Sequence, residues 1–315
     1  MRISIVIPCY NAESFVQRAL QSALEQTHPD VEIICVDDGS RDATLHVLND
    51  FQGRFPDRIK VVNQANQGAC AARNNGLAQS SGTYIEFLDA DDSLMPGKLA
   101  HQADLATKRG LPDLIIGSSI TRASDGSVVE HDIQRDAGRD PWMDLMQHKL
   151  GGTPQNLWKR AALVAVNGWN TQMASSQEYD LMFRLLANGA SIAFDDTVLT
   201  EIHQLPGGSI SRSNPDRNWA RFVELRASII RHLSNSTPTL DTRPHYQVLF
   251  DSIRTLYPYA PARAVELYRE HVPKDFKPGP SPATGKGYLL LHNVFGFAWA
   301  NRLRHAIAKT SARMP

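Results

Sequence analysis

The sequence predicts an α/β fold in which a mostly parallel β-sheet is flanked by helices, followed by a helical C-terminal region. Three observations support this prediction. Short apolar runs rich in β-branched residues alternate with segments of helical periodicity over residues 1–117. Asp-rich polar stretches follow two of these runs directly, and helical patterns dominate after residue 216. The alternation is typical of β-α-β units, which form parallel sheets through right-handed crossovers.

Five apolar runs have the length and composition of buried strands. They are residues 3–7, 31–36, 59–62, 84–88 and 114–117. The segments between them are expected to be helical, because their apolar residues recur at helical spacing. The first of these helices is expected to have Asn11 as its N-cap, and the fourth to have Pro96 in its first turn. The second and third are expected to include residues 45–51 and 69–79. Later in the chain, residues 158–166, 178–187 and 218–233 are expected to be helical, and residues 191–194 and 198–203 extended.

The composition describes an ordinary soluble globular chain. Of its 315 residues, 42% are hydrophobic and 21% are charged, and the formal net charge is zero. A chain without net charge has no overall field that attracts nucleic acid, so we expect no nucleic-acid partner. Cys9, Cys35 and Cys70 are far apart and odd in number, which excludes a disulfide framework and a zinc motif and fits a reducing, cytoplasmic location. We expect neither a signal peptide nor a spanning helix, since Pro8 interrupts the first apolar run and residues 288–300 are too few to cross a bilayer.

Acidic residues follow two of the predicted strands, at the sheet edge where α/β proteins bind ligands. Asp89 and Asp91 come directly after an apolar run, and two carboxylates in one loop can hold a hard cation such as Mg²⁺ or Mn²⁺. An isolated Asp-x-Asp is also common as a solvated loop that caps the next helix. Asp38 lies in a similar segment, where its side chain can accept hydrogen bonds from a base or ribose, or simply close a turn.

Three further residues can carry chemistry, and each has a structural alternative. Arg73 can bind a phosphate through its guanidinium fork, or it is a surface charge. Glu178 can remove a proton from an acceptor hydroxyl, or it is an acid favourably placed in a helix's first turn, as Asp180 is. His203 can bind a metal as neutral imidazole, or it is structural. No glycine-rich dinucleotide or phosphate loop follows the first strand.

Together these segments resemble the large family-2 glycosyltransferases with the GT-A fold, a Rossmann-like α/β fold. The resemblance covers residues 3–211, about two-thirds of the chain. The segments that carry it are Ile5-Val6-Ile7-Pro8-Cys9-Tyr10-Asn11, Val36-Asp37-Asp38-Gly39-Ser40, Asn66-Gln67-Gly68 with Ala72-Arg73-Asn74, Phe87-Leu88-Asp89-Ala90-Asp91-Asp92 and Gln177-Glu178-Tyr179-Asp180-Leu181. Each is modest alone, but their order and spacing are specific for the family, though not for one activity within it.

The resemblance implies a role for each matching position. It implies nucleotide-sugar binding by Pro8, Tyr10, Glu13, Asp38, Arg73 and Asp89, binding of Mn²⁺ or Mg²⁺ by Asp91 and His203, and general-base catalysis by Glu178. The family often has Glu-Asp where this chain has Gln177-Glu178, so the implied base is one methylene longer here. Residues 207–209 would belong to a mobile loop that follows the histidine.

The implied activity is a metal-dependent, inverting transfer of a sugar from a nucleotide-diphosphate sugar, expected to be UDP-linked. The implied acceptor is a hydroxyl of a glycan or lipid-linked glycan in polysaccharide or cell-surface glycan synthesis. Two other classes stay open, a nucleotidyltransferase and a non-catalytic nucleotide-sugar-binding module. The missing glycine-rich activation loop argues against the first, and the presence of both Asp91 and Glu178 against the second.

The resemblance also divides the chain. A catalytic domain is expected at residues 1–215, with a nucleotide-binding half at 1–117 and an acceptor half at 118–215. A helical region follows at residues 216–315, with a linker rich in proline and glycine at 273–287.

The C-terminal tail carries a separate question. After Asp275 the chain has six Lys or Arg residues and no acidic residue. Apolar residues between Leu289 and Leu303 are mixed with these charges. The pattern fits an amphipathic helix at the inner face of the cell membrane, or a helix packed on the catalytic domain or on the partner in a homodimer.

Overall fold

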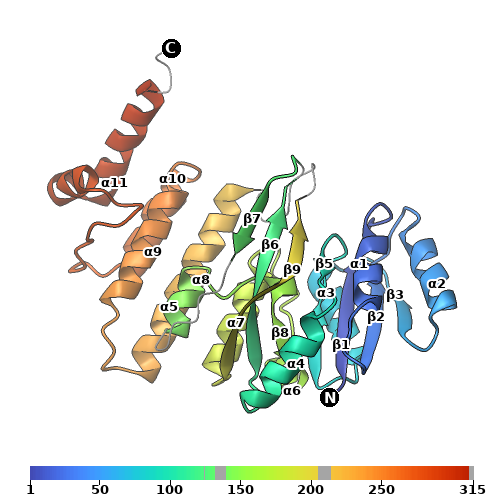
Figure 1. Ribbon diagram of the computed structural model, residues 1–315. Helices are drawn as coiled ribbons and strands as arrows, with labels where there is room; N and C mark the ends of the chain where they lie inside the picture. Colours follow the sequence, from blue (N-terminus) through green and yellow to red (C-terminus); the bar gives the residue numbers. More distant parts are fainter. Residues whose placement is uncertain (124, 132–139, 205–213, 312–315) are drawn as a thin grey trace. The chain divides into compact units, whose positions relative to one another are not determined.

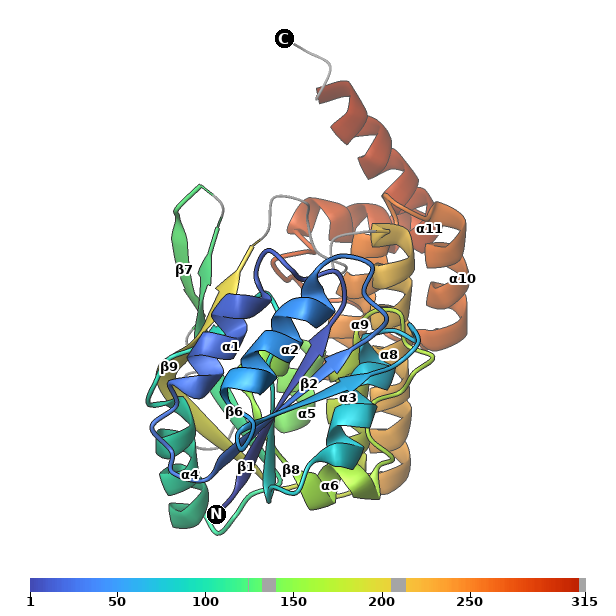
Figure 2. The same ribbon diagram turned by 90° about the vertical axis from the view of Figure 1, so that its right-hand side faces the viewer.

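The computed structural model describes residues 1–123, 125–131, 140–204 and 214–311, with side chains up to residue 307. The chain divides into two compact units, Met1–Ser209 and Ile210–Pro315, and each is described by itself. Figures 1 and 2 show their elements from two directions.

A nine-stranded sheet forms the centre of the first unit, in the order β3-β2-β1-β4-β8-β6-β9-β5, with β7 paired to β6. The strands are β1 (Ile3–Cys9), β2 (Val31–Asp37), β3 (Ile59–Asn63), β4 (Tyr84–Phe87), β5 (Ser93–Leu94), β6 (Leu114–Arg122), β7 (Val128–His131), β8 (Leu157–Lys159) and β9 (Ile192–His203). Strands β1 to β4 are parallel to one another, and β6 and β9 form a second parallel pair. The short strands β5, β7 and β8 are antiparallel to their neighbours. The predicted mixed α/β fold with a mostly parallel sheet is therefore confirmed.

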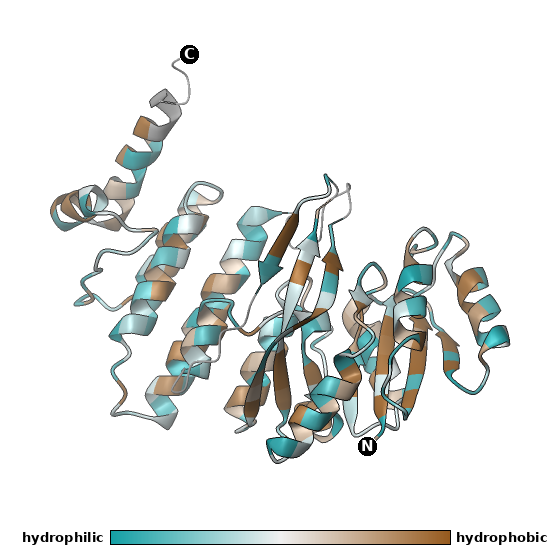
Figure 3. Cartoon of the chain, viewed as in Figure 1, coloured by the Kyte–Doolittle hydropathy of each residue, from teal (hydrophilic) through white to brown (hydrophobic). Residues whose placement is uncertain are grey.

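Helices cover both faces of this sheet. They are α1 (Val16–Leu24), α2 (Thr44–Arg54), α3 (Ala69–Gln79), α4 (Lys98–Lys108), α5 (Pro141–Met146), α6 (Arg160–Ala165) and α7 (Gln177–Ala187), with a 3-10 turn, η1, at Thr153–Gln155. Because side chains alternate along a strand, Ile3, Ile5 and Ile7 of β1 join the core that includes α1, α2 and α4. Val6 faces the other way, against α3, where a Cβ at Gly76 would lie 2.2 Å from its side chain. The brown strands of Figure 3 show the apolar composition that accompanies this two-sided burial.

All five predicted strands exist, and β1 and β6 are longer than expected. The N-cap predicted at Asn11 is wrong, because α1 begins only at Val16. Asn11 instead has φ 48°, and its Oδ1 accepts a hydrogen bond from the Arg41 backbone at 2.9 Å. Its side chain therefore holds a loop of the neighbouring strand rather than a helix end.

Two other local predictions also needed correction. Residues 158–166 are not one helix, since Trp158 lies in β8, fully buried and paired with both β4 and β6. Tertiary packing decides this segment over its helical pattern. Pro96 precedes α4 rather than beginning it, because Gly97 is the residue at the cap. The two extended segments expected after residue 190 form the single strand β9.

The second unit is helical, as the sequence predicts. It contains α8 (Pro215–Ser236), α9 (Arg243–Leu256), α10 (Pro261–His271) and α11 (Lys286–Ser311). Phe250 lies among aromatic rings that include Tyr268 and Phe297. Its ring centroid is 6.1 Å from that of Tyr268 and 5.8 Å from that of Phe297. Helix α11 is interrupted at Gly296, which has φ 72°. No described helix is long and apolar enough to cross a membrane.

The three cysteines are free and buried, as predicted. Burial raises the pKa of the Cys35 thiol to about 12 and that of Cys70 to about 11. Both thiols therefore stay protonated and unreactive at neutral pH.

Candidate active site

The acidic loop, Asp89 to Asp92, follows β4 at the carboxyl edge of the sheet. The Leu88 backbone donates to the carbonyl of Val6 at 3.0 Å, and the Asp92 backbone donates to that of Asp89 at 3.1 Å. These bonds fold the loop into a tight turn beyond β1 and β4. Three carboxylates are therefore held within four consecutive residues at the edge predicted to bind ligands.

This loop carries more negative charge than its surroundings neutralise. Burial, with the charge of Asp89 adding to it, raises the pKa of Asp91 above its usual range. Burial and the charges of Asp89 and Asp91 raise the pKa of Asp92 to about 8. Repulsion between like charges of this kind is relieved by a bound cation.

Arg73 joins the acidic loop to the start of α7. Its guanidinium, 6% exposed, donates to Asp89 Oδ1 at 2.7 Å and to Gln177 Oε1 at 2.9 Å. It also lies over the ring of Trp169, 4.7 Å from the ring centre. Because its charge and planar geometry are fixed by these contacts, Arg73 is prepared to face an anion without reorganising.

Two carboxylates in the first turn of α7 have different surroundings. Asp180 accepts a hydrogen bond from Arg184 Nε at 2.8 Å, and Arg184 also donates to the carbonyls of Val166 and Gly168. Asp180 thus orients Arg184, and Arg184 ties α7 to the preceding loop. Glu178 has no ion pair among the residues that the structure describes, and burial raises its pKa, with Arg73 opposing and Asp89 reinforcing the rise. A carboxylate with a raised pKa is a stronger base at neutral pH.

His203, at the end of β9, contacts the acidic loop through its backbone. Its amide donates to Asp92 Oδ1 at 2.9 Å, and its Nε2 lies 3.1 Å from Ser93 Oγ. Burial and the nearby charge of Arg18 lower the pKa of His203, so the ring is neutral at pH 7. A neutral imidazole is the form that binds metals. Residues 207–209, expected to follow as a mobile loop, lie outside the described residues.

Asp38 is buried at the end of β2 and organises a neighbouring loop. Its carboxylate accepts hydrogen bonds from Gln64 Nε2 at 2.8 Å and from the backbones of Gln67 and Gly68 at 2.9 and 2.8 Å. Gly39 has φ 71°, and a Cβ there would lie 2.9 Å from the Asn66 backbone nitrogen. Glycine is required where the two loops approach this closely.

The other residues predicted to bind the nucleotide lie at the end of β1 and in the loop after it. Pro8 is partly buried in β1, and Tyr10 is 48% exposed. Glu13 accepts a hydrogen bond from the Ala43 backbone at 2.7 Å. The structure therefore brings Arg73, Asp89, Asp91, Glu178 and His203 around the acidic loop, whereas Asp38 and Glu13 hold loops of the β1–β2 edge.

The structure adds Arg18 of α1 to this site. Its guanidinium donates to the Asp91 backbone carbonyl at 2.5 Å, and its charge counteracts the rise in the pKa values of Asp91 and Asp92. Sequence reasoning missed Arg18 because it looks like any charged residue on the polar face of a helix. Trp169 was missed too, since an isolated Trp gives no sign of the arginine that it supports.

Within the described part of the chain, no three His, Cys, Asp or Glu side chains are arranged to hold a metal ion by themselves. The residues fit a cation whose coordination is completed by oxygen atoms of the substrate. Mg²⁺ is commonly held by one or two carboxylates together with substrate phosphates. Asp91 and His203, whose backbone binds Asp92, are the candidates for such a partial donor set, and the raised pKa of Asp91 reflects charge that a cation would neutralise.

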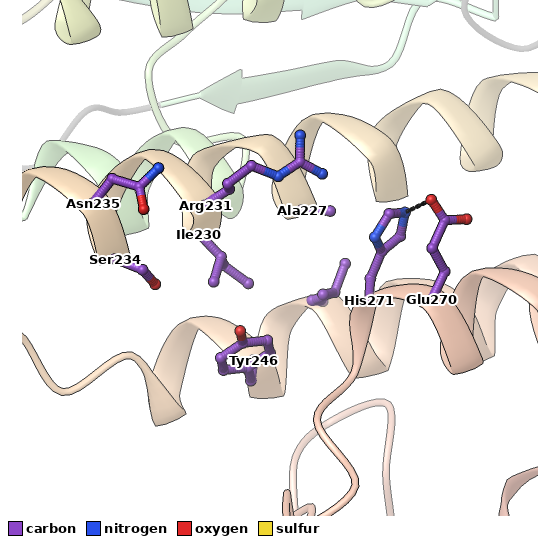
Figure 4. Close-up of a pocket in the computed structure, with 9 residues that line it drawn as sticks. Ala227, Ile230, Arg231, Ser234, Asn235, Tyr246, Glu270 and His271 are labelled. Carbon is purple, nitrogen blue, oxygen red and sulfur yellow. Dashed lines mark ion pairs between the residues drawn. The ribbon is translucent and has the colours of Figure 1, made fainter. Parts of the chain in front are cut away.

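A pocket of about 280 Å³ lies in the helical unit, between α8, α9 and the end of α10. Figure 4 shows its polar side chains, which include Arg231, Tyr246 and the Glu270–His271 ion pair, on separate helices. Among the described residues, Glu270 is the only carboxylate that lines it. We assign the chemistry to the acidic loop rather than to this pocket, because only the loop combines fixed arginines with carboxylates of raised pKa.

Comparison with known proteins agrees with this geometry. The family model described as glycosyl transferase family 2 matches residues 4–164, which include β1, Arg73 and the acidic loop. The chain belongs to glycosyl transferase family 2. The matched segment ends before Glu178 and His203, so their roles are not assigned by the family match.

The chain is also similar to curated relatives and to solved structures. A putative teichuronic acid biosynthesis glycosyltransferase, TuaG of Bacillus subtilis, is 36% identical over 129 residues, which cover 41% of this chain and 50% of TuaG. Residues 1–349 of S. aureus TarS in complex with UDP-GlcNAc match with a TM-score of 0.71 and 18% identity, over 99% of this chain and 92% of that one. The mannosyltransferase PcManGT of Pyrobaculum calidifontis, in complex with GDP-Man and Mn²⁺, matches with a TM-score of 0.53 and 16% identity, over 99% and 88%.

These likenesses differ in what they establish. At such low identity, the two structures establish a shared fold with TarS and PcManGT. The chain spans about a third of the length of the curated relatives that it matches first, between 30% and 38%.

Proposed function

We propose that this chain transfers a sugar from a UDP-linked donor to a hydroxyl of a glycan or lipid-linked glycan, with inversion of the anomeric configuration. The observation that carries the proposal is the position of Arg73, which contacts both the acidic loop and the start of the helix that bears Glu178. A donor held at the acidic loop therefore lies beside a carboxylate with a raised pKa. That is the pairing that a direct displacement requires, with leaving-group binding on one side and a base on the other.

The transfer follows from these positions. Glu178 accepts the proton of the acceptor hydroxyl, and that oxygen forms a bond to the anomeric carbon. The bond between this carbon and the diphosphate breaks, and its electron pair leaves with the nucleoside diphosphate. Arg73, fixed by Asp89, Gln177 and Trp169, stabilises the charge that develops on the leaving oxygen. A single displacement of this kind inverts the anomeric centre.

We propose Mn²⁺ or Mg²⁺ as the cofactor, held by Asp91 and His203. When bound, the ion would neutralise charge on the diphosphate. The accumulated charge of the acidic loop supports this assignment, and so does the Mn²⁺ of PcManGT, whose fold is similar. The UDP-GlcNAc complex of TarS supports a uridine nucleotide, and TuaG's name supports a cell-surface polymer as the product.

We propose that the catalytic domain comprises residues 1–215, with nucleotide chemistry in residues 1–117 and acceptor binding in residues 118–215. The acidic loop belongs to the first part and Glu178 to the second. Residues 216–315 would then serve a role outside catalysis.

The test has two steps. Binding of UDP-, GDP- and dTDP-sugars is first measured by calorimetry in Mn²⁺ and in EDTA, together with the slow release of the nucleoside diphosphate. We expect metal-dependent binding of UDP-sugars with release of UDP. Donor binding without any release, even with added glycan acceptors, would favour the non-catalytic module instead.

The second step compares two variants of one helix turn. Glu178→Gln should lose transfer by at least about 1,000-fold while donor binding stays within about twofold, because the amide cannot accept the proton. Asp180→Asn is the matched control, since Asp180 pairs with Arg184, and it should keep most of its turnover where the protein is folded. Wild-type turnover of Glu178→Gln would contradict the assignment of the base.

A further inference from the structure

Helix α11 exposes an unusual amount of apolar surface. Trp299 is 56% exposed and Ile307 61%, and Leu303 lies between them at helical spacing of four residues. Before the break at Gly296, Leu290 is 70% exposed and Val294 72%. In Figure 3, brown stretches recur along this helix. After the break, Trp299, Leu303 and Ile307 form a row on one helical segment. Such a row of large apolar side chains marks an interaction surface, whereas isolated exposed apolar residues need no explanation.

The opposite side of the helix is already packed within its unit. The ring of Phe297 stacks on that of Tyr268, with 4.2 Å between centroids and 7° between planes. Asn301 donates to the hydroxyl of Tyr288 at 2.8 Å, and Ala300 is fully buried. Since these contacts fix one face of the helix against its own unit, the row of Trp299, Leu303 and Ile307 faces away from the core of that unit.

Positive charge lies on both sides of this row. On a helical projection, Arg302 stands to one side of Trp299, Leu303 and Ile307, and Arg304 to the other, toward the packed side of the helix. The guanidinium of Arg302 lies over the Trp299 ring, 5.2 Å from its centre. From Phe276 to the last residue the sequence has no Asp or Glu, so no acidic side chain of this segment offsets the charge.

We propose that the face of α11 after Gly296, defined by Trp299, Leu303 and Ile307, docks the protein on an anionic lipid bilayer. The apolar row enters the boundary between head groups and acyl chains, Trp299 lies at that boundary, and Arg302 and Arg304 pair with lipid phosphates. No described helix spans a membrane, so the contact lies in the plane of the surface. This surface belongs to the second unit and the acidic loop to the first, and the inference does not depend on the proposed transfer.

Charge favours a bilayer over a second copy of the chain. A symmetric dimer through this face would bring the same patch of two molecules together, arginine facing arginine. An anionic lipid surface instead attracts each of these cations, by about fivefold in affinity per residue near the surface.

The test is co-sedimentation of the full chain with vesicles of phosphatidylcholine alone and of phosphatidylcholine with phosphatidylglycerol. We expect binding to the anionic vesicles, weaker binding in 0.5 M salt, and little binding to the neutral ones. Trp299→Glu with Leu303→Glu should lower the affinity at least about tenfold, because the apolar row is lost. Arg302→Gln with Arg304→Gln should lower it about 25-fold while keeping the apolar row intact.

The matched control is Val128→Glu with Val129→Glu, which changes two exposed apolar residues of β7 and should bind vesicles as the unmodified chain does. Thermal unfolding of each variant shows that it is folded. Absence of vesicle binding, equal binding to both kinds of vesicle, or equal loss in the β7 control would each overturn the proposal. Self-association without vesicle binding, abolished by Trp299→Glu with Leu303→Glu, would overturn it in favour of a second copy.

Discussion

The two Asp-rich segments of the first unit look alike in sequence and differ in structure. Each follows a buried parallel strand, and each ends in a turn. In the segment after β2, the Asp38 carboxylate accepts three hydrogen bonds from the loop at residues 64–68. In the segment after β4, Asp91 and Asp92 have raised pKa values, because burial and mutual repulsion outweigh their hydrogen bonds.

The difference separates a carboxylate that holds a neighbouring loop from one that, under the proposed function, binds a ligand. Donated hydrogen bonds satisfy the charge of Asp38, so its segment holds the loop at residues 64–68 in place. The acidic loop keeps unneutralised charge that is costly in the free protein and favourable once a cation or a bound ligand balances it. The following predictions test this comparison, from the largest expected effect to the smallest.

Asp91→Asn should have the largest effect. Removing the proposed metal ligand should lower kcat/KM at least about 1,000-fold, roughly 4 kcal/mol of transition-state stabilisation. Folding should be unaffected or improved. A carboxyl whose pKa is raised on folding costs stability above that pKa, and the amide removes this cost. Steady-state kinetics and urea unfolding measure the two effects. A protein that loses stability and activity together would place Asp91 with Asp38 as a structural residue.

Lys98→Met tests what holds the acidic loop in place. Lys98 Nζ contacts Glu86 Oε2 at 2.5 Å and the Pro154 carbonyl at 2.9 Å. The side chains of Lys98 and Glu86 are fully buried, and in the sequence Glu86 precedes the acidic loop and Lys98 follows it. Leaving Glu86 unpaired should cost about 3 kcal/mol of unfolding free energy. Lys98→Met with Glu86→Leu should recover most of it.

The control for this pair is Lys108→Met. Lys108 pairs with Asp104 on the exposed surface of α4, and its loss should cost less than about 0.5 kcal/mol. Equal effects of Lys98→Met and Lys108→Met in urea unfolding would show that the buried pair does not secure the loop.

Asp38→Ala should have a smaller effect on stability. It leaves two backbone N–H groups and the Gln64 amide without their acceptor, which should cost about 2 kcal/mol. Donor affinity should fall with it, because the loop at residues 64–68 loses its support. Asp50→Ala, which removes an exposed partner of Arg54, is the control and should change unfolding by less than about 0.5 kcal/mol. Unchanged stability of Asp38→Ala would mean that its carboxylate is not the anchor of this loop.

Much of this architecture could be predicted from sequence, because local patterns carry it. The five apolar runs became strands, and the Asp-rich segments fell at their carboxyl ends. What could not be predicted depends on contacts between distant segments. Trp158 became a strand residue through pairing with β4 and β6, and Arg18 reached the Asp91 carbonyl across 73 residues. Nor could sequence tell Asp38 from Asp91, since their hydrogen-bond partners come from other loops.

The smallest expected effect is a shift in the pH dependence of transfer. As the proposed base, Glu178 must be ionised to accept a proton, so activity should fall as pH drops through its pKa. Burial raises that pKa above the usual 4.5, with Asp89 reinforcing the rise and Arg73 opposing it. The acid limb of kcat/KM should therefore lie above the range of an exposed glutamate. Asp89→Asn should move this limb toward lower pH, because it removes a neighbouring negative charge, whereas Asp38→Asn should leave it in place. A limb at or below pH 4.5 in the unmodified chain would mean that the base is solvated in the free protein or that Glu178 is not the base.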